Sequence, residues 1–507
     1  MNDKSINYKY GAVSSGHRLV SEVGLDILKA GGNAFDAVIA CGFASTVCEP
    51  MLTSLGGGGF LLTREKGGQT RLFDFFSNHS GLHYTQTTGR AIEPKFLPIT
   101  VNFPSSDQVF QSGLASVATP GCLHGYFYAH QRLGRLPMQD VVRPAIDLAR
   151  NGVALTPFQA YAHQLLSEVV LSTPESCAIF ARHDGQNGNG QGSDGKLVVK
   201  ETGEMIFNRD LADFMEILAI EGSDLFYRGE VARQIADDML STTGFVTIDD
   251  LSHYQTIERQ PLTYQNREGS VYGNPPPSSG STLAFKQLDI LSHHQPAGML
   301  DADSQRQWLA SFKAVDKWRN QQEKQQQDQQ QQSPRLFSRG TTHVSVIDKE
   351  GQCAAMTTSN GEGSGYIVPN TGIMLNNMMG EDDLHPHGFY ASEAGTRIAS
   401  MMSPTIAVSD DGQVIAMGSG GSKRIRTAIT QVLWQLLHQK RHLVDAIRQP
   451  RMHFDGELLQ CEPGYEKSLA VANHWQQQDM YFGGVHAVSS HDLPVADNRR
   501  EGFSVYQ

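Results

Sequence analysis

The feature that most constrains this chain is a threonine that opens a β-patterned segment directly after a stretch too polar to build a core. Residues 321–333 are rich in glutamine and charge and contain no apolar side chain, which predicts an exposed, mobile segment. Beyond it, alternating side chains from Thr342 predict a strand, residues 348–351 predict a turn, and residues 353–358 predict a second strand. The sequence therefore predicts a β-hairpin that begins at a threonine.

A threonine at such a boundary becomes a nucleophile if the chain is cut in front of it. A threonine hydroxyl is weakly nucleophilic at neutral pH and needs an adjacent base. An α-amino group on the same residue, with a pKa near ~8, can serve as that base. Cleavage between Gly340 and Thr341 would create this amine.

Composition excludes several other classes of protein. The 507 residues are 39% hydrophobic and 19% charged, which is enough chain for a large core or more than one domain. The formal charge is −12, and no run of Lys or Arg suits a phosphate backbone, so we expect no nucleic-acid partner. The first ten residues lack the apolar core of a secretory signal, and this predicts a cytoplasmic protein.

Membrane, metal and nucleotide sites are not predicted either. The apolar stretch 34–52 is interrupted by Asp36 and Glu49, which argues against a membrane span. The six cysteines lack metal-ligand spacing and are predicted to be buried or reduced thiols, so we expect no metal and no cofactor. The glycine run at 55–62 lacks the Lys-Ser/Thr pair of a phosphate loop and precedes a strand-like segment. It predicts a close approach of backbone to backbone or to substrate.

Periodicity and turn residues predict several helices. The expected helical segments are 22–30, 33–40, 124–131, 141–150, most of 210–239, and 283–291. The first two are joined by a tight glycine turn, with Asn33 as the N-cap of the second. Residues 274–281 contain three consecutive prolines and predict a rigid loop, which is either a connector or a wall of a pocket.

A set of short motifs, ordered along nearly the whole chain, resembles the γ-glutamyltranspeptidase family. The motifs are Gly-Gly-Asn-Ala at 31–34, Leu-Gly-Gly-Gly-Gly-Phe at 55–60, Thr-Pro-Gly at 119–121, Pro-Pro-Pro-Ser-Ser-Gly at 275–280, Thr-Thr-His-Val-Ser-Val at 341–346, Leu-Asn-Asn at 375–377, Met-Ser-Pro-Thr at 402–405 and Gly-Ser-Gly-Gly-Ser at 418–422. No single motif would suffice, but their combination and order are specific.

The resemblance implies an α+β fold, the N-terminal-nucleophile hydrolase αββα sandwich of four layers. It also implies autoprocessing at Gly340–Thr341. The expected products are a large chain of residues 1–340, with a glutamine-rich mobile tail at about 321–340, and a small chain of residues 341–507. The two chains would form a heterodimer and together make one structural domain.

The resemblance also implies roles for individual residues. Thr341 matches the nucleophile, and Gly420 and Gly421 match the glycines whose backbone N–H groups stabilise the oxyanion. Ser359 falls at the position of a second hydroxyl that hydrogen-bonds the nucleophile, with Thr358 as a competing assignment.

Other matches concern the substrate. Asn360 and Glu381 match contacts to the amino-acid end of the substrate, and Ser400 matches one of two serines that bind its carboxylate.

Three departures from the family pattern concern the same end of the substrate. Phe76 stands where the family has an arginine that clamps the α-carboxylate, Met401 replaces the second serine, and Met378 replaces a glutamine. Arg397 or the pair 423–424 are candidate replacement cations.

The predicted activity is cleavage of γ-glutamyl amides such as glutathione through an acyl-enzyme, with water or an amino-acid or peptide amine as acceptor. The alternatives are an acylase for a non-glutamyl acyl group and an inactive, unprocessed homologue.

Overall fold

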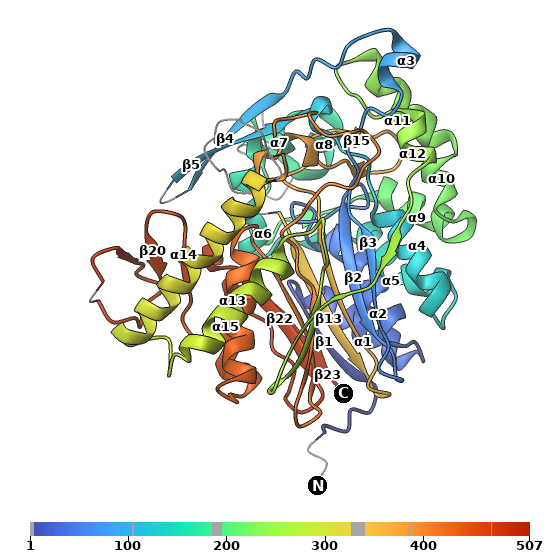
Figure 1. Ribbon diagram of the computed structural model, residues 1–507. Helices are drawn as coiled ribbons and strands as arrows, with labels where there is room; N and C mark the ends of the chain where they lie inside the picture. The colour runs from blue at the N-terminus through green and yellow to red at the C-terminus, as the bar shows by residue number, and fades with distance from the viewer. Residues whose placement is uncertain (1–4, 104–105, 185–194, 326–339, 386, 468) are drawn as a thin grey trace.

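The computed structural model describes residues 5–103, 106–184, 195–325, 340–385, 387–467 and 469–507. Two antiparallel β-sheets lie at its centre (Figure 1). In spatial order, the first consists of β10 (Ile257–Arg259), β3 (Thr70–Phe75), β2 (Gly58–Arg64), β14 (Cys353–Ser359), β13 (Thr342–Asp348), β1 (Gly11–Ser15) and β23 (Phe503–Tyr506). The second consists of β11 (Leu262–Asn266), β12 (Gly269–Gly273), β17 (Thr405–Ser409), β18 (Val414–Gly420) and β22 (Gly484–Ser489).

The hairpin predicted after the glutamine-rich segment is confirmed. Strands β13 and β14 pair with Thr342 opposite Thr358, and they occupy the middle of the seven-stranded sheet between β1 and β2. Every residue of both strands is buried, so the hairpin is covered on both faces. The segment that begins at the candidate nucleophile is therefore a central element of the core.

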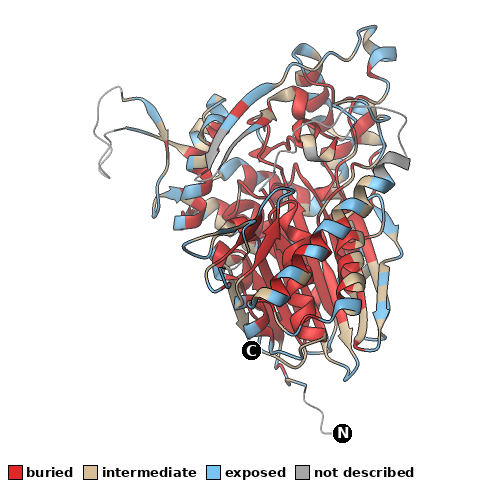
Figure 2. Ribbon diagram, turned by 60° about the vertical axis from the view of Figure 1, so that its left-hand side comes forward, coloured by how far each residue is buried: buried red, intermediate tan, exposed pale blue. Residues whose placement is uncertain are grey.

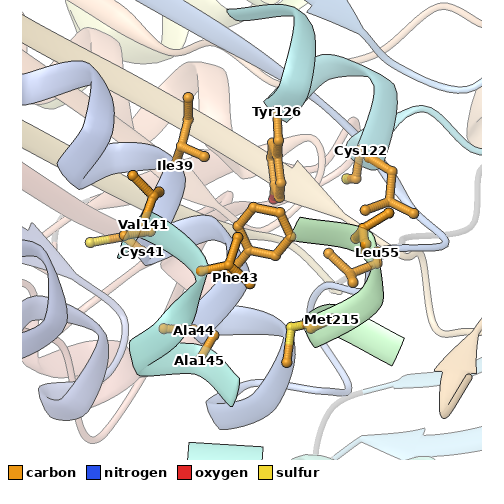
Figure 3. Packing of buried hydrophobic residues seen from close by; sticks show 14 of the residues in the cluster. Ile39, Cys41, Phe43, Ala44, Leu55, Cys122, Tyr126, Val141, Ala145 and Met215 are labelled. Atoms are coloured by element: carbon orange, nitrogen blue, oxygen red, sulfur yellow. The ribbon is translucent and has the colours of Figure 1, made fainter. Parts of the chain in front are cut away.

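Helices cover one face of the seven-stranded sheet and bury a large apolar cluster against it. The helices against the sheet are α1 (Arg18–Lys29), α2 (Ala34–Cys48) and α4 (Cys122–Leu133), and α5 (Met138–Asn151) packs on the outer side of α2. Figure 3 shows part of this packing around Phe43 and Tyr126. Helix α2 begins as predicted, because Asn33 accepts hydrogen bonds from the N–H groups of the first turn while the Asp36 carboxylate accepts the N–H of Asn33. It extends beyond the predicted end at residue 40 because all of its residues are buried.

The other face of this sheet packs against the five-stranded sheet. A second apolar cluster joins Phe60 and Phe76 of the first sheet to Ile406 and Ala416 of the second. Helices α13 (Gly280–His294), α14 (Ala302–Gln325), α15 (Arg424–Leu437) and α16 (Leu443–Arg448) contribute to the same cluster or border it. Figure 2 shows buried residues concentrated in this central region.

The predicted helices at 124–131, 141–150 and 283–291 correspond to α4, α5 and α13. The segment 210–239 is divided into α9 (Arg209–Glu221), α10 (Asp224–Tyr227) and α11 (Glu230–Ser241), because Gly222 adopts a positive φ of 81° and ends the first of them.

The glutamine-rich segment expected to be exposed and mobile from residue 321 begins inside a helix. Residues 321–325 are the last turn of α14, whose earlier part is anchored in the core by Trp308, Phe312 and Val315. Glutamine, glutamate and lysine have good helix propensity and allow this helix to continue without burying apolar surface. The rest of the predicted tail, 326–339, lies outside the described residues.

The remaining elements are short and mostly peripheral. They are α3 (Tyr84–Thr88), β4 (Leu97–Phe103), β5 (Ser106–Ser112), η1 (Leu114–Ser116), β6 (Val153–Ala154), α6 (Pro157–Leu165), α7 (Ser167–Val170), α8 (Pro174–Phe180), β7 (Ala181–His183), β8 (Leu197–Val199), β9 (Met205–Ile206), α12 (Ile248–Ser252), β15 (Ile367–Val368), β16 (Ile373–Met374), η2 (Met378–Gly380), η3 (Asp382–Leu384), β19 (Met452–Phe454), β20 (Leu459–Cys461), β21 (Ala472–His474), η4 (Met480–Phe482) and η5 (Asn498–Arg500). Within the described ranges, no helix combines the length and apolarity needed to cross a membrane. All six cysteines are free thiols, and five of them are buried.

Candidate active site

The register of the central sheet places Thr341 at one end of a row that crosses four strands. Ser359 pairs with Gly58, and the pairs on either side of this row are Thr342 with Thr358 and Gly59 with Phe75. Extending the register by one residue gives the row Thr341, Ser359, Gly58 and Phe76. Because directly opposed residues point to the same face, these side chains face the five-stranded sheet. Phe76 lies in the core cluster between the two sheets, as this face requires.

The peptide bond in front of Thr341 is held by a hydroxyl group. Ser359 Oγ donates a hydrogen bond to the carbonyl oxygen of Gly340 and accepts one from the N–H of Gly361 at 3.0 Å. Gly340 is in close contact with the backbone of Gly361, since a Cβ on Gly340 would lie 1.6 Å from the Gly361 carbonyl oxygen. Thr341 itself is 5% exposed. Ser359 is thus placed to act on a charge that develops on the Gly340 oxygen.

Thr358, the competing candidate for the second hydroxyl, points to the opposite face of the sheet. Its Oγ1 accepts a hydrogen bond from Thr53 Oγ1 at 2.9 Å, on the side covered by α2 and α4. Thr357 returns to the first face, where its hydroxyl forms a 2.8 Å hydrogen bond with Nδ1 of His343. Burial holds the pKa of His343 well below its ordinary value, so this imidazole is neutral.

The end of strand β18 lies directly against Thr341, the candidate nucleophile. A Cβ on Gly420 would lie 2.3 Å from the carbonyl oxygen of Thr341, so only glycine permits this approach. Gly421 follows with a φ of +115°, a conformation that glycine adopts readily. Of the two glycines predicted to stabilise an oxyanion, Gly420 borders Thr341 and Gly421 directly follows it in the chain.

Two charged side chains, Arg500 and Glu49, flank Thr341 and Thr342. The sequence patterns did not single them out as site residues. Arg500 Nη1 donates to the carbonyl oxygen of Thr341 at 3.0 Å. On the helix side of the sheet, Thr342 Oγ1 lies 3.0 and 3.1 Å from the two carboxylate oxygens of Glu49. Burial raises the pKa of Glu49 to about 7, although the hydrogen bond from Thr342 opposes this shift.

Polar side chains cluster around Gly361. They include Glu381 and Asn360, which are predicted to contact the amino-acid end of the substrate. A Cβ on Gly361 would lie 2.4 Å from Glu381 Oε1 and 2.0 Å from Asn377 Oδ1. Asn360 Nδ2 points to the carbonyl oxygen of Leu375 at 3.5 Å. Glu381 and Asn360 are both nearly fully buried, and through Gly361 they adjoin the Gly340–Thr341 peptide.

Ser400 and Met401 are held by the proline-rich loop. The carbonyl oxygen of Ser400 accepts hydrogen bonds from the Ser279 N–H at 2.9 Å and from Ser278 Oγ at 2.8 Å. Ser279 Oγ lies 3.0 Å from the sulfur of Met401, and Ser400 Oγ accepts the N–H of Met402 at 3.1 Å. The loop therefore does more than connect two elements, because it fixes the backbone of the segment predicted to bind substrate.

The position expected to hold a cationic clamp is apolar. Phe76 is 1% exposed and stacks on Phe60 with 5.5 Å between ring centroids. Met378 is buried in the same cluster.

Arg397, considered above as a replacement cation, is already engaged elsewhere. Its Nε lies 3.1 Å from Asp74 Oδ1, and the guanidinium donates to Tyr254 Oη at 2.7 Å and to the carbonyl oxygens of Phe76 and Gln255. Arg424 is also buried, and its Nε donates to the carbonyl oxygen of Tyr481 at 3.0 Å. The structure contradicts the suggestion that Arg397 supplies the missing clamp, because its Nη1 and Nη2 already donate to protein acceptors and its Nε faces the Asp74 carboxylate.

No group of three or more His, Cys, Asp or Glu side chains in the described part of the chain is arranged to hold a metal ion. The chemistry available around Thr341 is that of hydroxyls, backbone amides, carboxylates and one guanidinium.

Comparisons with known proteins identify the family of this chain. The family model for γ-glutamyltranspeptidase matches residues 20–315 and 299–506. A glutathione hydrolase proenzyme of Escherichia coli (strain K12) is 32% identical over 91% of this chain and 84% of its own length. The acylase ACY 1 proenzyme of Pseudomonas sp. (strain V22) is 29% identical over 91% of this chain and 86% of its own.

A solved structure supports the fold. The crystal structure of cephalosporin acylase from Bacillus halodurans superposes with a TM-score of 0.73, covering 100% of this chain and 97% of the other at 21% identity. The family model and the relatives match the chain both before and after Thr341. The chain belongs to the γ-glutamyltranspeptidase family.

Proposed function

We propose that this protein is an autoprocessed threonine hydrolase and acyltransferase whose nucleophile is Thr341. The observation that carries the proposal is the environment of the Gly340–Thr341 peptide, whose carbonyl accepts a hydrogen bond from Ser359 while Gly420 borders the next carbonyl. The names of two relatives, each a proenzyme, support cleavage of the precursor into two chains. In this proposal residues 1–340 and 341–507 remain associated as a heterodimer with the N-terminal-nucleophile hydrolase αββα layering.

Cleavage would begin with attack of Thr341 Oγ on the Gly340 carbonyl carbon. The carbonyl oxygen becomes an oxyanion, and the Ser359 hydroxyl that already donates to it stabilises this charge. Collapse breaks the peptide C–N bond, protonates the threonine nitrogen and leaves an ester between Gly340 and Oγ. Water then hydrolyses the ester, which releases the Gly340 carboxylate and the free α-amine of Thr341.

Turnover repeats this chemistry on an external amide. The neutral α-amine takes the proton of Oγ as Oγ attacks the substrate carbonyl, and the proton passes to the leaving amine. The backbone N–H groups of Gly420 and Gly421 are the proposed donors to the oxyanion, and loss of one such donor costs about 10²–10³ in rate. The acyl-enzyme then transfers its acyl group to water or to an acceptor amine.

The first proposed substrate class is γ-glutamyl amides, including glutathione, with Asn360, Glu381 and Ser400 at the amino-acid end. The E. coli relative named glutathione hydrolase supports this class.

A second substrate class, acyl amides without an α-carboxylate, is favoured by the absence of a free cation at the clamp position among the described residues. Phe76 fills the clamp position with an apolar, stacked ring, and Arg397 is bound to Asp74. An acyl group without an α-carboxylate avoids the cost of leaving a buried carboxylate unpaired, about 2–5 kcal/mol. The Pseudomonas relative named as an acylase supports this alternative.

Purified wild type and Thr341→Ala should first be compared on a denaturing gel. We expect two bands for wild type and one full-length band for the variant. A single band for both would refute processing and favour an inactive, unprocessed homologue.

The processed protein should then be tested against γ-glutamyl, glutaryl and other acyl anilides. Preference for the γ-glutamyl compound supports the first class, and preference for an acyl group without the α-carboxylate supports the second. Turnover of none by fully processed protein would refute the proposed activity.

A further inference from the structure

Arg500 occupies a buried groove that is shaped to admit a guanidinium beside the nucleophile. It ends the short helix η5 near the C-terminus, is 3% exposed, and reaches residue 341 across 159 positions of sequence. A Cβ on Gly420 would lie 2.6 Å from its Nη1, and a Cβ on Gly484 would lie 2.7 Å from its Cδ. Gly420 and Gly484 are paired across β18 and β22, so two facing glycines open the groove in which this side chain lies.

Only part of the guanidinium is used by the surrounding protein. Nη1 donates to the Thr341 carbonyl at 3.0 Å, whereas Nε and Nη2 are buried and have no hydrogen-bond partner among the described residues. Burying a cation in this way is costly unless its charge is used. Nη2 also lies close to Gly421, at 3.2 Å from the position of a Cβ there. The side chain therefore touches the residue that attacks and both glycines proposed to hold the oxyanion.

We propose that Arg500 is a positioning residue for Thr341, fixing its carbonyl and placing a positive charge beside the amino group that cleavage creates. This inference rests on the proposed function. The carbonyl oxygen and the amino nitrogen belong to the same residue, so the guanidinium lies within about 6 Å of the amine. A cation at that distance favours the neutral amine, which is the form that accepts the proton of Oγ.

Other charges around Arg500 determine how strong this effect is. The charged groups that face it are Arg424 from α15, Asp497 ahead of η5, Glu49 at the end of α2 and Asp479 ahead of η4. Burial and the neighbouring Arg424 lower the pKa of Arg500 to about 10, which leaves it charged at neutral pH. His486, on the adjacent strand β22, has its pKa lowered to about 4 by burial and is neutral in the same range.

The test compares wild type, Arg500→Gln and Arg500→Lys as full-length proteins, measuring processing on a gel and the pH profile of kcat/KM with γ-glutamyl and glutaryl anilides. Arg500→Gln removes the charge, so the amine pKa rises and the acidic limb of the profile should move up by about one pH unit or more. We expect kcat to fall at least tenfold with little change in KM, because Arg500 is buried and acts through Thr341. Arg500→Lys retains the charge and should keep the wild-type acidic limb while still losing kcat.

Each outcome either supports or overturns the proposed role of Arg500. Arg500→Gln that is processed and active with an unmoved acidic limb overturns the inference alone. Arg500→Gln that keeps the circular dichroism spectrum of the wild type but remains uncleaved supports the role in holding the Thr341 carbonyl. If Arg500→Gln does not fold, Arg500→Lys decides, and wild-type kcat in that variant overturns the inference. Wild type that is neither processed nor active overturns the proposed function and this inference together.

Discussion

Replacing Ser359 by alanine tests how the precursor bond is activated. The change removes the one described hydroxyl that donates to the Gly340 carbonyl oxygen and leaves the Gly361 N–H without its 3.0 Å acceptor. The charge on this oxygen grows during attack by Thr341, so the lost donor should cost about 3–4 kcal/mol in the transition state, or about 10²–10³ in the rate of processing. The folded state should lose only about 1–2 kcal/mol, the net worth of one or two hydrogen bonds.

Thr358→Val is the matched control, because the neighbouring hydroxyl lies on the opposite face and bonds to Thr53 at 2.9 Å. It should reduce stability by a similar amount and leave processing within about threefold of wild type. The assay follows the precursor band over time after purification at low temperature, alongside thermal unfolding of each variant. Processing of Ser359→Ala at the wild-type rate, or slower processing in Thr358→Val than in Ser359→Ala, would refute the assignment of Ser359.

Two further predictions concern specificity and pH. Phe76→Arg should lower the KM for a γ-glutamyl anilide at least tenfold relative to Phe76→Leu. It should cost a few kcal/mol in stability, because a stacked core ring is lost. A submillimolar KM in wild type would contradict the missing clamp. Glu49, whose pKa is raised to about 7, favours folding most when it is protonated, so its contribution is complete below the unfolded pKa of 4.5 and declines as pH rises to about 7. In denaturant unfolding, Glu49→Gln should therefore be more stable than wild type at pH 8 by up to about 3 kcal/mol and equal to it at pH 4. The same stability difference at both pH values would show that titration of Glu49 does not cause the difference.

The parts of the fold that the sequence predicted depend on local patterns. The hairpin from Thr342, the capped start of α2 at Asn33 and the close backbone approach at 55–59 all follow from turn residues and alternation within a few positions. The extent of α2 and α14 was not predicted, because burial on every side lengthened one helix and helix propensity alone extended the other.

The charged side chains that flank Thr341 and Thr342 could not be predicted from local sequence patterns. Glu49 contacts Thr342 across 293 positions and Arg500 contacts Thr341 across 159, so no local spacing connects them. Each carried a weak signal, since Glu49 interrupts an apolar run and Arg500 follows another arginine near the C-terminus. Their position depends on tertiary packing, which brings the end of α2 to Thr342 and the segment before β23 to Thr341.

The same register explains the departure at Phe76. Glycine at position 58 separates it from Ser359 in a single row, so the residue that follows β3 shares a face with Thr341, three strands away. In the proposed function, the residues that break the bond belong to the hairpin of β13 and β14, and the clamp position lies at the end of β3. A substitution at Phe76 is therefore expected to change which acyl group is accepted without removing the residues that break the bond.

The most direct test of the central claim is the intact mass and N-terminal sequence of the purified wild-type protein. We expect two polypeptides, one ending at Gly340 and one beginning with Thr-Thr-His-Val at Thr341, and a single uncut polypeptide for Thr341→Ala. A second polypeptide that begins at any other residue, or an uncut wild type that still hydrolyses an acyl anilide, would contradict Thr341 as the N-terminal nucleophile.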